Sequence, residues 1–460
     1  MKPKTINIYE TYGFSILGAD YWIFDGIDVD GRGDSTSQYL IRIGYAIENA
    51  SSINGSQNIV IKNCSITLDK RVSGFSPPNA MGILQSTVNR APSMASGTNS
   101  KNQFLNLKIQ QCDIGIYVRS YPTYPDSLLE IGSTDPSRFM EIGSVKGDDI
   151  SQEAIRVESV TGLSIHHIIS RMPFFVSSLG TTRIYNNKII TSKGNTTLTL
   201  RNGSSFNNSD GLKFDVFNNF FSMPRSKNRD RIFSDAISVV NSSIYGENAE
   251  LNFYNNSVFV DESMSQSTIL STSCFALSPF PTKTKLVNNV FVNATHLSSN
   301  NKGQYCIVGA LNENSLSNYN AFWRADSAAR IGAQPTQGIY SLNLTEWRNA
   351  HGAIVQDVNS IETNPLFLSD TDLHAYGLGI DGKGTTPPNG LAVDIDNEPR
   401  NAPFDIGADQ FMRQTTDLAV VDLIEPNDAS LVLCENRVNK VKVGSYAKRR
   451  LLGIRLSDSP

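Results

Sequence analysis

The stretch Ile184-Tyr185-Asn186-Asn187-Lys188-Ile189 places two asparagines between apolar residues, and this pattern recurs along the chain. With the first asparagine as marker, further copies stand at Asn218, Asn255 and Asn288, and a degenerate copy at Asn320. The spacings are 32, 37, 33 and 32 residues. A fixed period of this length is typical of a repeat architecture.

The residues around each copy predict short strands. They are β-branched and alternating, as in residues 58–61 and 236–240. Looser copies upstream have their marker at Asn63 and Gln111, and a third includes His166 and His167. Short strands with one amide corner per period predict an all-β parallel solenoid, whose coils stack about 4.8 Å apart.

The recurring asparagine has a physical reason in such a solenoid. Asparagine tolerates the left-handed backbone of a tight corner, and stacked asparagine side chains can hydrogen-bond along the axis as an amide ladder. A β-sandwich would not require one asparagine per period. The repeat therefore favours the solenoid over the sandwich.

Two longer spacings indicate insertions. Asn63 and Gln111 are 48 residues apart, which predicts that residues 70–101 leave a coil as a loop. Gln111 and His167 are 56 residues apart, and residues 121–126 begin a second excursion. In solenoids such loops gather on one flank and often form the walls of a binding groove.

The cysteines predict neither a zinc site nor a disulfide-rich scaffold, because no pair has zinc-ligand spacing. Cys64 and Cys112 each follow the marker position, whereas Cys274 and Cys306 each precede it by 14 residues. The second pair should stack in adjacent coils, close enough for a disulfide. A stack of two small interior thiols is an equally good interpretation.

Composition excludes several functional classes. The 460 residues include 40 Lys and Arg against 44 Asp and Glu, a formal charge of −4, which argues against a nucleic-acid partner. No apolar run approaches the length of a transmembrane helix. Residues 1–8 lack the apolar region of a secretory signal.

The C-terminal third carries a recognisable set of segments. They are Ser-Leu-Asn-Leu-Thr-Glu-Trp-Arg at 341–348, Asn-Pro-Leu-Phe at 364–367, Asp-Leu-His at 372–374, Val-Asp-Ile-Asp-Asn-Glu-Pro-Arg at 393–400 and Asp-Ile-Gly-Ala-Asp at 405–409. Their order resembles the closing segment of secreted bacterial right-handed parallel β-helix proteins of the pectate-lyase-like superfamily, especially Bacteroidetes-type surface proteins. The chain departs from that pattern at residues 379–382, at Asn397 and at Gln410, where glutamate is common.

The resemblance covers residues 13–411 and implies a right-handed parallel β-helix domain over residues 1–412. Residues 413–460 resemble a linker and the first strands of an immunoglobulin-like module. A complete sandwich needs about 100 residues, and only 44 remain from Asp417 onward. We therefore expect an incomplete β-sandwich-like segment, a natural chain extending beyond both ends, and an extracellular or cell-surface location with the signal upstream.

Enzymes of this superfamily cleave acidic polysaccharides by elimination or hydrolysis. Asp148 and Asp149, with Glu153 nearby and Arg171 about one coil later, are the candidate catalytic residues. They resemble the Gly-Asp-Asp motif of polygalacturonases, although that family's other motifs are absent. The alternative is a solvated turn, where paired aspartates are common.

Calcium is a possible cofactor, as it is in superfamily lyases. Asp28, Asp30 and Asp34 have the spacing of a calcium loop, but Tyr39 stands where an EF-hand has glutamate. A turn after a strand explains these aspartates without a metal. In the same way, the aromatic residues Tyr121, Tyr124 and Trp323 can stack on sugars or simply pack at corners.

Taken together, the sequence predicts a monomeric β-helix that engages polysaccharide or a cell-surface glycan, either as a divergent polysaccharide lyase or glycoside hydrolase or as a binder. The alternative is a non-catalytic adhesin or a structural stalk of a surface protein. An enzyme should gather charged side chains and one or two aromatics in a groove, whereas a stalk should scatter them.

Overall fold

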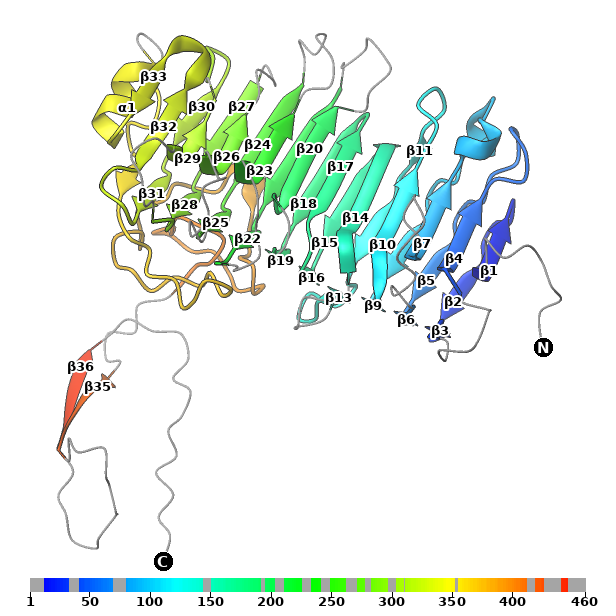
Figure 1. Ribbon diagram of the computed structural model, residues 1–460, viewed down its shortest axis with the longest axis horizontal. Coiled ribbons are helices and arrows are strands. Elements are labelled where there is room, and N and C mark those ends of the chain that lie inside the picture. Colours follow the sequence, from blue (N-terminus) through cyan, green and yellow to red (C-terminus); the bar gives the residue numbers. More distant parts are fainter. Residues whose placement is uncertain are drawn as a thin grey trace, which may run out of the picture.

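The chain forms a parallel β-helix in the computed structural model (Figure 1). The structure describes residues 12–32, 41–68, 80–143, 150–191, 195–202, 211–225, 233–240, 249–261, 271–277, 283–296, 303–309, 311–351, 355–411, 418–425 and 440–445. Three long sheets run the length of the solenoid, and each coil contributes a strand to each of them in turn. The predicted all-β solenoid is confirmed.

Sheet A contains β1 (Tyr12–Leu17), β4 (Ile43–Glu48), β7 (Met81–Ser86), β10 (Cys112–Arg119), β14 (Ile150–Thr161), β17 (Phe174–Ser178), β20 (Leu198–Asn202), β23 (Phe233–Val240), β26 (Ser271–Leu277), β29 (Gly303–Val308), β32 (Arg330–Gln334) and β33 (Ile339–Ser341), with β11 (Asp126–Ser127) beside β14. Sheet B contains β2 (Ile23–Asp25), β5 (Val60–Lys62), β8 (Gln103–Leu105), β12 (Glu130–Gly132), β15 (Leu163–His166), β18 (Thr181–Tyr185), β21 (Lys213–Phe217), β24 (Glu250–Tyr254), β27 (Lys283–Val287) and β30 (Leu316–Asn318). Sheet C contains β3 (Val29–Asp30), β6 (Ser65–Thr67), β9 (Lys108–Gln110), β13 (Met140–Ile142), β16 (Ile168–Ser170), β19 (Lys188–Ile190), β22 (Phe220–Met223), β25 (Ser257–Val260), β28 (Val290–Asn293), β31 (Ala321–Arg324) and β34 (Ile361–Glu362).

The two asparagines of each repeat do different work at the corner between sheets B and C. The first takes the left-handed conformation, with φ of 53° at Asn186 and 54° at Asn218. The second points inward and forms the ladder, where Asn187 Nδ2 donates to Asn219 Oδ1 at 2.9 Å and Asn219 Nδ2 to Asn256 Oδ1 at 3.0 Å. The predicted amide ladder therefore exists, and it is built by the second asparagine.

The predicted corner residue was wrong in some of the first and last coils. Register pairs Lys62 with Leu105, so Asn106, and not Gln111, is the corner residue of the coil after Asn63. Residues 81–86 inside the predicted loop form β7, because sheet A needs a strand in that coil. At the other end Tyr319 takes the left-handed position, and Asn320 is a ladder residue.

The cysteines follow the corrected register. Cys64 follows the corner residue Asn63, whereas Cys112 opens β10, so these two do not share a position. Cys274 and Cys306 lie side by side on β26 and β29 as predicted, both fully buried. Both are free thiols, and burial followed by their mutual hydrogen bond raises the pKa of Cys274 well above its ordinary value. Of the two interpretations of this pair, the structure therefore agrees with the stack of two interior thiols and not with the disulfide.

Ring stacking along the axis fills the interior of the C-terminal half. Phe221, Phe253, Phe291 and Phe322 are fully buried or nearly so, and the Phe291 and Phe322 ring centroids lie 5.7 Å apart. Phe221, Phe291 and Phe322 share one inward slot of sheet C, with Val258 in the coil between the first two, whereas Phe253 faces them from β24 of sheet B. One continuous core results.

The C-terminal end of the solenoid is covered by non-repeating structure. Strand β33 pairs antiparallel with β32, and helix α1 (Leu344–Ala350) follows, capped by the Asn343 side chain. Trp347 of α1 is buried over Gly332 and donates to Asp357 Oδ2 at 3.0 Å. The described residues also include four 3-10 turns, η1 (Val88–Arg90), η2 (Ala95–Gly97), η3 (Pro335–Gln337) and η4 (Pro388–Gly390).

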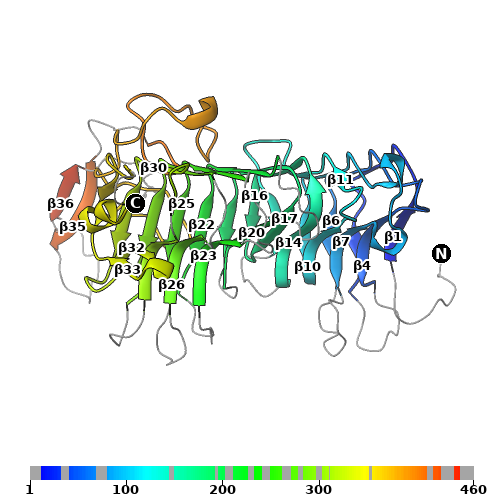
Figure 2. The ribbon, with the colours of Figure 1, turned by 90° about the horizontal axis from the view of Figure 1, so that it is seen from above.

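After β34 the chain folds back over the outer face of sheet C, and we call residues 363–411 the strap. Figure 2 shows it in orange along one side of the C-terminal coils. One outward position of sheet C is occupied by Ser65, Lys108 and Glu141 in the early coils. In later coils the residues at the same position include Phe220, Val290 and Ala321. The outward face of sheet C therefore becomes more apolar where the strap lies. Strap residues such as Leu373, Ile380 and Ile406 are buried there.

The corner asparagines also hold the strap. Asn218 Nδ2 donates to Val393 O at 2.7 Å, Asn255 Nδ2 to Gly407 O at 3.3 Å, and Asn288 Nδ2 to Thr385 O at 2.8 Å. These side chains point out of the solenoid, so their amides are available to an added chain. The repeat therefore supplies both an inner ladder and an outer docking line.

Beyond the strap, β35 (Leu418–Glu425) and β36 (Lys440–Ser445) form an antiparallel pair. The predicted domain boundary at residue 412 lies outside the described residues, as does Cys434. Among the described residues, no helix has the length and apolar character to span a bilayer.

Candidate functional site

A groove of about 570 Å³ lies over the early coils, at the B–C corner and on the adjoining outer face of sheet C. We call it the corner groove. Its lining residues come from four successive coils, and they are Asp28, Asn63, Cys64, Ser65, Asn106, Leu107, Lys108, Ser133, Asp135, Arg138, Phe139 and Glu141. This is the part of sheet C that has polar outward residues and is not covered by the strap.

Corner amides form the floor of the groove along its long axis. Asn63 Nδ2 donates to Asp25 Oδ1 at 2.7 Å, and Asn106 Nδ2 donates to Asn63 Oδ1 at 3.0 Å and to Thr134 Oγ1 at 2.9 Å. Both residues have the left-handed backbone of the repeat. The floor is thus a line of oriented amide dipoles running parallel to the solenoid axis.

The walls carry both signs of charge. Lys108 Nζ lies 3.6 Å from Glu141 Oε2 on neighbouring strands of sheet C, and Arg138 Nε lies 3.6 Å from Asp135 Oδ2. Hydrogen bonds from Ser137, followed by the Arg138 charge, hold the pKa of Asp135 below its ordinary value. Asp28 Oδ1 accepts from Ser65 N at 2.6 Å. Each wall carboxylate therefore has a local partner that fixes its position.

The groove ends where the strap begins. Phe139 lines the groove, and Lys188 Nζ lies 5.0 Å from the centroid of its ring. The same Nζ lies 3.2 Å from Asp396 Oδ1 of the strap. Lys188 thus joins the end of the groove to the strap.

A buried histidine pair lies next to this end. His166 Nδ1 and His167 Nδ1 are 3.0 Å apart, His167 Nε2 is 3.1 Å from Asn186 Nδ2, and His166 Nε2 is 3.2 Å from Glu130 Oε1. Burial, followed by the His166 charge, lowers the pKa of His167 to about 4. His167 occupies the corner position with φ of 52°, so the looser copy of the repeat at His166 and His167 does supply a corner residue.

Of the candidate catalytic residues, Asp148 and Asp149 lie outside the described residues. Glu153 lies on β14 of sheet A, where the Arg156 guanidinium donates to it at 3.0 Å and to Glu158 at 2.8 Å. The Arg156 guanidinium also lies 4.5 Å from the Phe175 ring centroid. Arg171 follows β16 of sheet C next to Gly143, and burial lowers its pKa. The structure therefore places Glu153 with Arg156 on sheet A, while Arg171 follows a strand of sheet C.

The candidate calcium ligands are also placed only in part. Asp28 lines the corner groove, Asp30 Oδ1 accepts from Arg32 Nε at 2.8 Å, and Asp34 lies outside the described residues. Hydrogen bonds from Arg32 lower the pKa of Asp30 to about 2. The calcium site at these three residues stays a prediction.

The aromatic candidates differ in their surroundings. Tyr121 and Tyr124 are exposed in the turn after β10, whereas Trp323 packs at the strap's edge against buried residues of sheet C. On sheet B, Tyr185 and Phe217 stack at 5.0 Å with nearly parallel planes. Because their faces cover each other, these two rings do not form a platform for a sugar.

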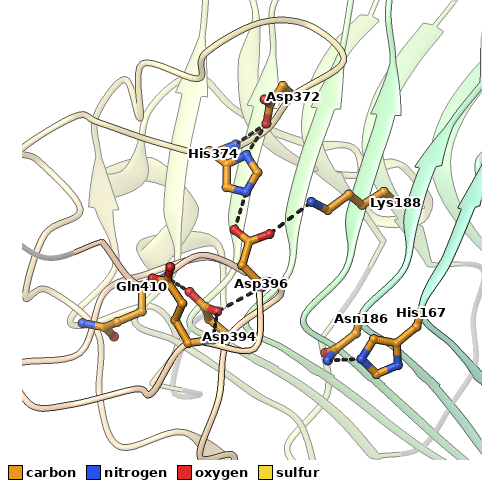
Figure 3. Close-up of polar contacts among 9 residues, drawn as sticks. His167, Asn186, Lys188, Asp372, His374, Asp394, Asp396 and Gln410 are labelled. Atoms are coloured by element: carbon orange, nitrogen blue, oxygen red, sulfur yellow. Dashed lines mark hydrogen bonds and ion pairs between the residues drawn. The ribbon is translucent and has the colours of Figure 1, made fainter. Parts of the chain in front are cut away.

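The strap contains a second polar cluster, shown in Figure 3 with Asp372, His374 and Asp396 at its centre. His374 Nδ1 is hydrogen-bonded to Asp372 Oδ1, and His374 Nε2 lies 2.6 Å from Asp396 Oδ2. Burial opposes protonation of His374, but the hydrogen bonds to Asp372 and Asp396 outweigh it and raise its pKa to about 9. The Phe220 ring packs at 4.9 Å from the imidazole with its plane nearly perpendicular to it.

Asp394 connects the strap segment around Asp396 to the segment around Gln410. Its Oδ1 accepts from Asp396 N at 3.0 Å and Glu398 N at 2.8 Å, and its Oδ2 accepts from Gln410 N at 3.0 Å. Single oxygens or nitrogens of His374, Asp396 and Asp409 thereby all lie within 4.8 Å of one another. These residues belong to the closing segments quoted from the sequence, but their convergence could not be read from spacing alone.

Sequence reasoning did not identify the corner groove. Its charged residues Lys108, Arg138 and Glu141 are ordinary surface residues in a linear view. The available signal was the change of outward sheet C residues from polar to apolar between coils, which requires the register to be known.

No protein-family model, no curated protein and no solved structure matches this chain. A proposal about its function therefore rests on the fold and on the geometry of the sites.

Proposed function

We propose that the β-helix binds polysaccharide along the corner groove, as an extracellular or cell-surface protein related to the pectate-lyase-like superfamily. The supporting observation is the groove itself, in which amides, carboxylates, cations and one aromatic ring line several coils in succession. An amide can donate to a sugar hydroxyl or accept from it, and a carboxylate can accept from it. A linear polymer lying along the axis would meet polar groups from each of the four coils.

The charge of the groove favours a neutral polysaccharide over a polyuronate. Three carboxylates, Asp28, Asp135 and Glu141, face two cations, Lys108 and Arg138. A polyuronate brings one negative charge per residue into this slightly acidic groove, where like charges repel. Neutral sugars offer hydroxyls to the same carboxylates without that cost.

The wall carboxylates support binding more than hydrolysis. A glycosidase needs two carboxyl groups flanking the bond, one of them held protonated by its surroundings. Asp135 has the opposite shift, and Lys108 lies beside Glu141. We therefore propose a binding protein of the adhesin kind.

Replacing Lys108 and Glu141 together by alanine should weaken polysaccharide binding at least tenfold, because two adjacent hydrogen-bonding groups leave the groove wall. Affinity electrophoresis and calorimetry with soluble neutral glucans, mannans and xylans, next to polygalacturonate and alginate, measure this. Both side chains are exposed, so the fold should be retained. Lys283→Ala, an exposed lysine on sheet B, is the matched control and should bind like the unchanged protein.

The same panel separates the other functions. Reducing-end release, or absorbance at 235 nm with and without Ca²⁺, would contradict a pure binding role. If that turnover falls in Asp148→Asn and Asp149→Asn, the enzyme hypothesis is supported instead. Absence of both binding and turnover over the whole panel would leave the structural stalk.

A further inference from the structure

The cluster in the strap has the geometry of a metal site. His374, Asp396 and Asp409 each offer one nitrogen or oxygen, and these atoms lie within 4.8 Å of one another. Asp409 is 3% exposed, whereas Asp396 is exposed. The site thus has a buried carboxylate at its base and access from solvent at Asp396.

The surroundings orient the possible ligands. Asp372 holds the Nδ1 side of the His374 ring, so Nε2 faces Asp396. A carboxylate on the far nitrogen of a histidine is the usual outer support of a metal-binding imidazole. Lys188 approaches the other oxygen of Asp396, Oδ1, at 3.2 Å. Asp396 Oδ2 is therefore the oxygen that faces the imidazole.

Charge balance also fits a divalent ion. In the metal-bound form the imidazole is neutral, so the carboxylates of Asp372, Asp396 and Asp409 against Lys188 sum to two negative charges. A divalent cation neutralises them. When it binds, the hydrogen between His374 Nε2 and Asp396 leaves to solvent, and both atoms become ligands.

We propose that His374, Asp396 and Asp409 bind a divalent transition-metal ion that fastens the strap to the solenoid. One imidazole with two carboxylates suits Zn²⁺ or Mn²⁺, with water completing the shell. Ca²⁺ prefers an all-oxygen set of six or more ligands, which this cluster does not supply. The ion lies beside Lys188, so it would stabilise the strap where it ends the corner groove.

Chelator-treated full-length protein titrated with Zn²⁺ or Mn²⁺ should bind one ion per chain with micromolar or tighter affinity by calorimetry. Thermal unfolding should shift upward by several degrees, and Ca²⁺ should produce neither effect. Hydrogen exchange should slow at Ile395 and Gln410, whose backbone amides donate to Ala408 O and Asp394 in the strap.

Asp409→Asn and His374→Gln should each weaken Zn²⁺ binding at least tenfold, whereas His296→Gln, at an exposed histidine that is not one of the three ligands, should bind as before. If either variant fails to fold, Asp396→Asn at the exposed ligand gives the same reading. Unchanged Zn²⁺ affinity in the folded variants, or no binding by the unchanged protein, would overturn the proposal.

Discussion

Replacing Asn256 by alanine is expected to lower the free energy of unfolding by about 4 kcal/mol, because several buried polar groups lose their partner at once. Asn256 Nδ2 donates to Val216 O at 3.0 Å and Asn289 Oδ1 at 3.1 Å, while its Oδ1 accepts from Asn219 N and Nδ2. The side chain is fully buried. Denaturant unfolding at equilibrium measures the difference.

Two further variants test the reason for this loss. Asn256→Asp keeps the size of the side chain but cannot donate to Val216 O, so it should destabilise the protein at least as much as alanine. Asn63→Gly keeps the left-handed backbone and removes an exposed amide, so it should cost no more than about 1 kcal/mol. If the Asn256 and Asn63 variants lose the same free energy of unfolding, the buried hydrogen bonds of the inner ladder add no more stability than an exposed corner amide does.

Asp126 should make the protein less stable as the pH rises from about 4 to 7. Burial raises its pKa to about 7, although hydrogen bonds from Gln85, Asn99 and Ser120 oppose the shift. The carboxyl thus keeps its proton in the folded chain at pH values where the unfolded chain has lost it. Its contribution is complete below pH 4 and falls by roughly 4 kcal/mol by the time the pH passes 7.

The measurement is denaturant unfolding at a series of pH values for the unchanged protein and for Asp126→Asn. The amide does not titrate, so the difference in unfolding free energy between the two proteins should narrow or reverse as the pH rises. Asn99 N and Gln85 Nε2 both donate to Asp126, at 2.8 Å each, so the variant loses an acceptor at every pH. Parallel curves from pH 4 to 8 would show that Asp126 is ionised throughout.

The repeat was predictable because its physics is local. A left-handed corner selects asparagine within a few residues, and the Asn186-Asn187 pattern shows it directly. The division of labour within the pair was not visible, because both asparagines look alike until the register says which one points inward. The same limit explains the misplaced corner at Gln111, where the true corner is Asn106.

The functional features depend on long-range contacts that no local pattern encodes. Lys188 belongs to the central repeat, yet it meets Asp396, which is 208 residues away, and Phe139 on an earlier coil. The closing segments could be recognised from the sequence, but their docking on the outer face of sheet C could not. The polar residues of the groove become a set only once the coils are stacked.

The coil from His167 to Asn186 shows how little chain one coil requires. Its 19 residues supply β16, β17 and β18, one strand for each sheet. The coil from Asn63 to Asn106 uses 43 residues for the corresponding strands β6, β7 and β8. The cross-section is thus independent of loop length, and the molecule can grow by whole units. Tandem duplication of residues 168–186 would lengthen the axis by about 4.8 Å without altering either neighbour. Gene duplication can therefore change the length of such a solenoid in fixed steps.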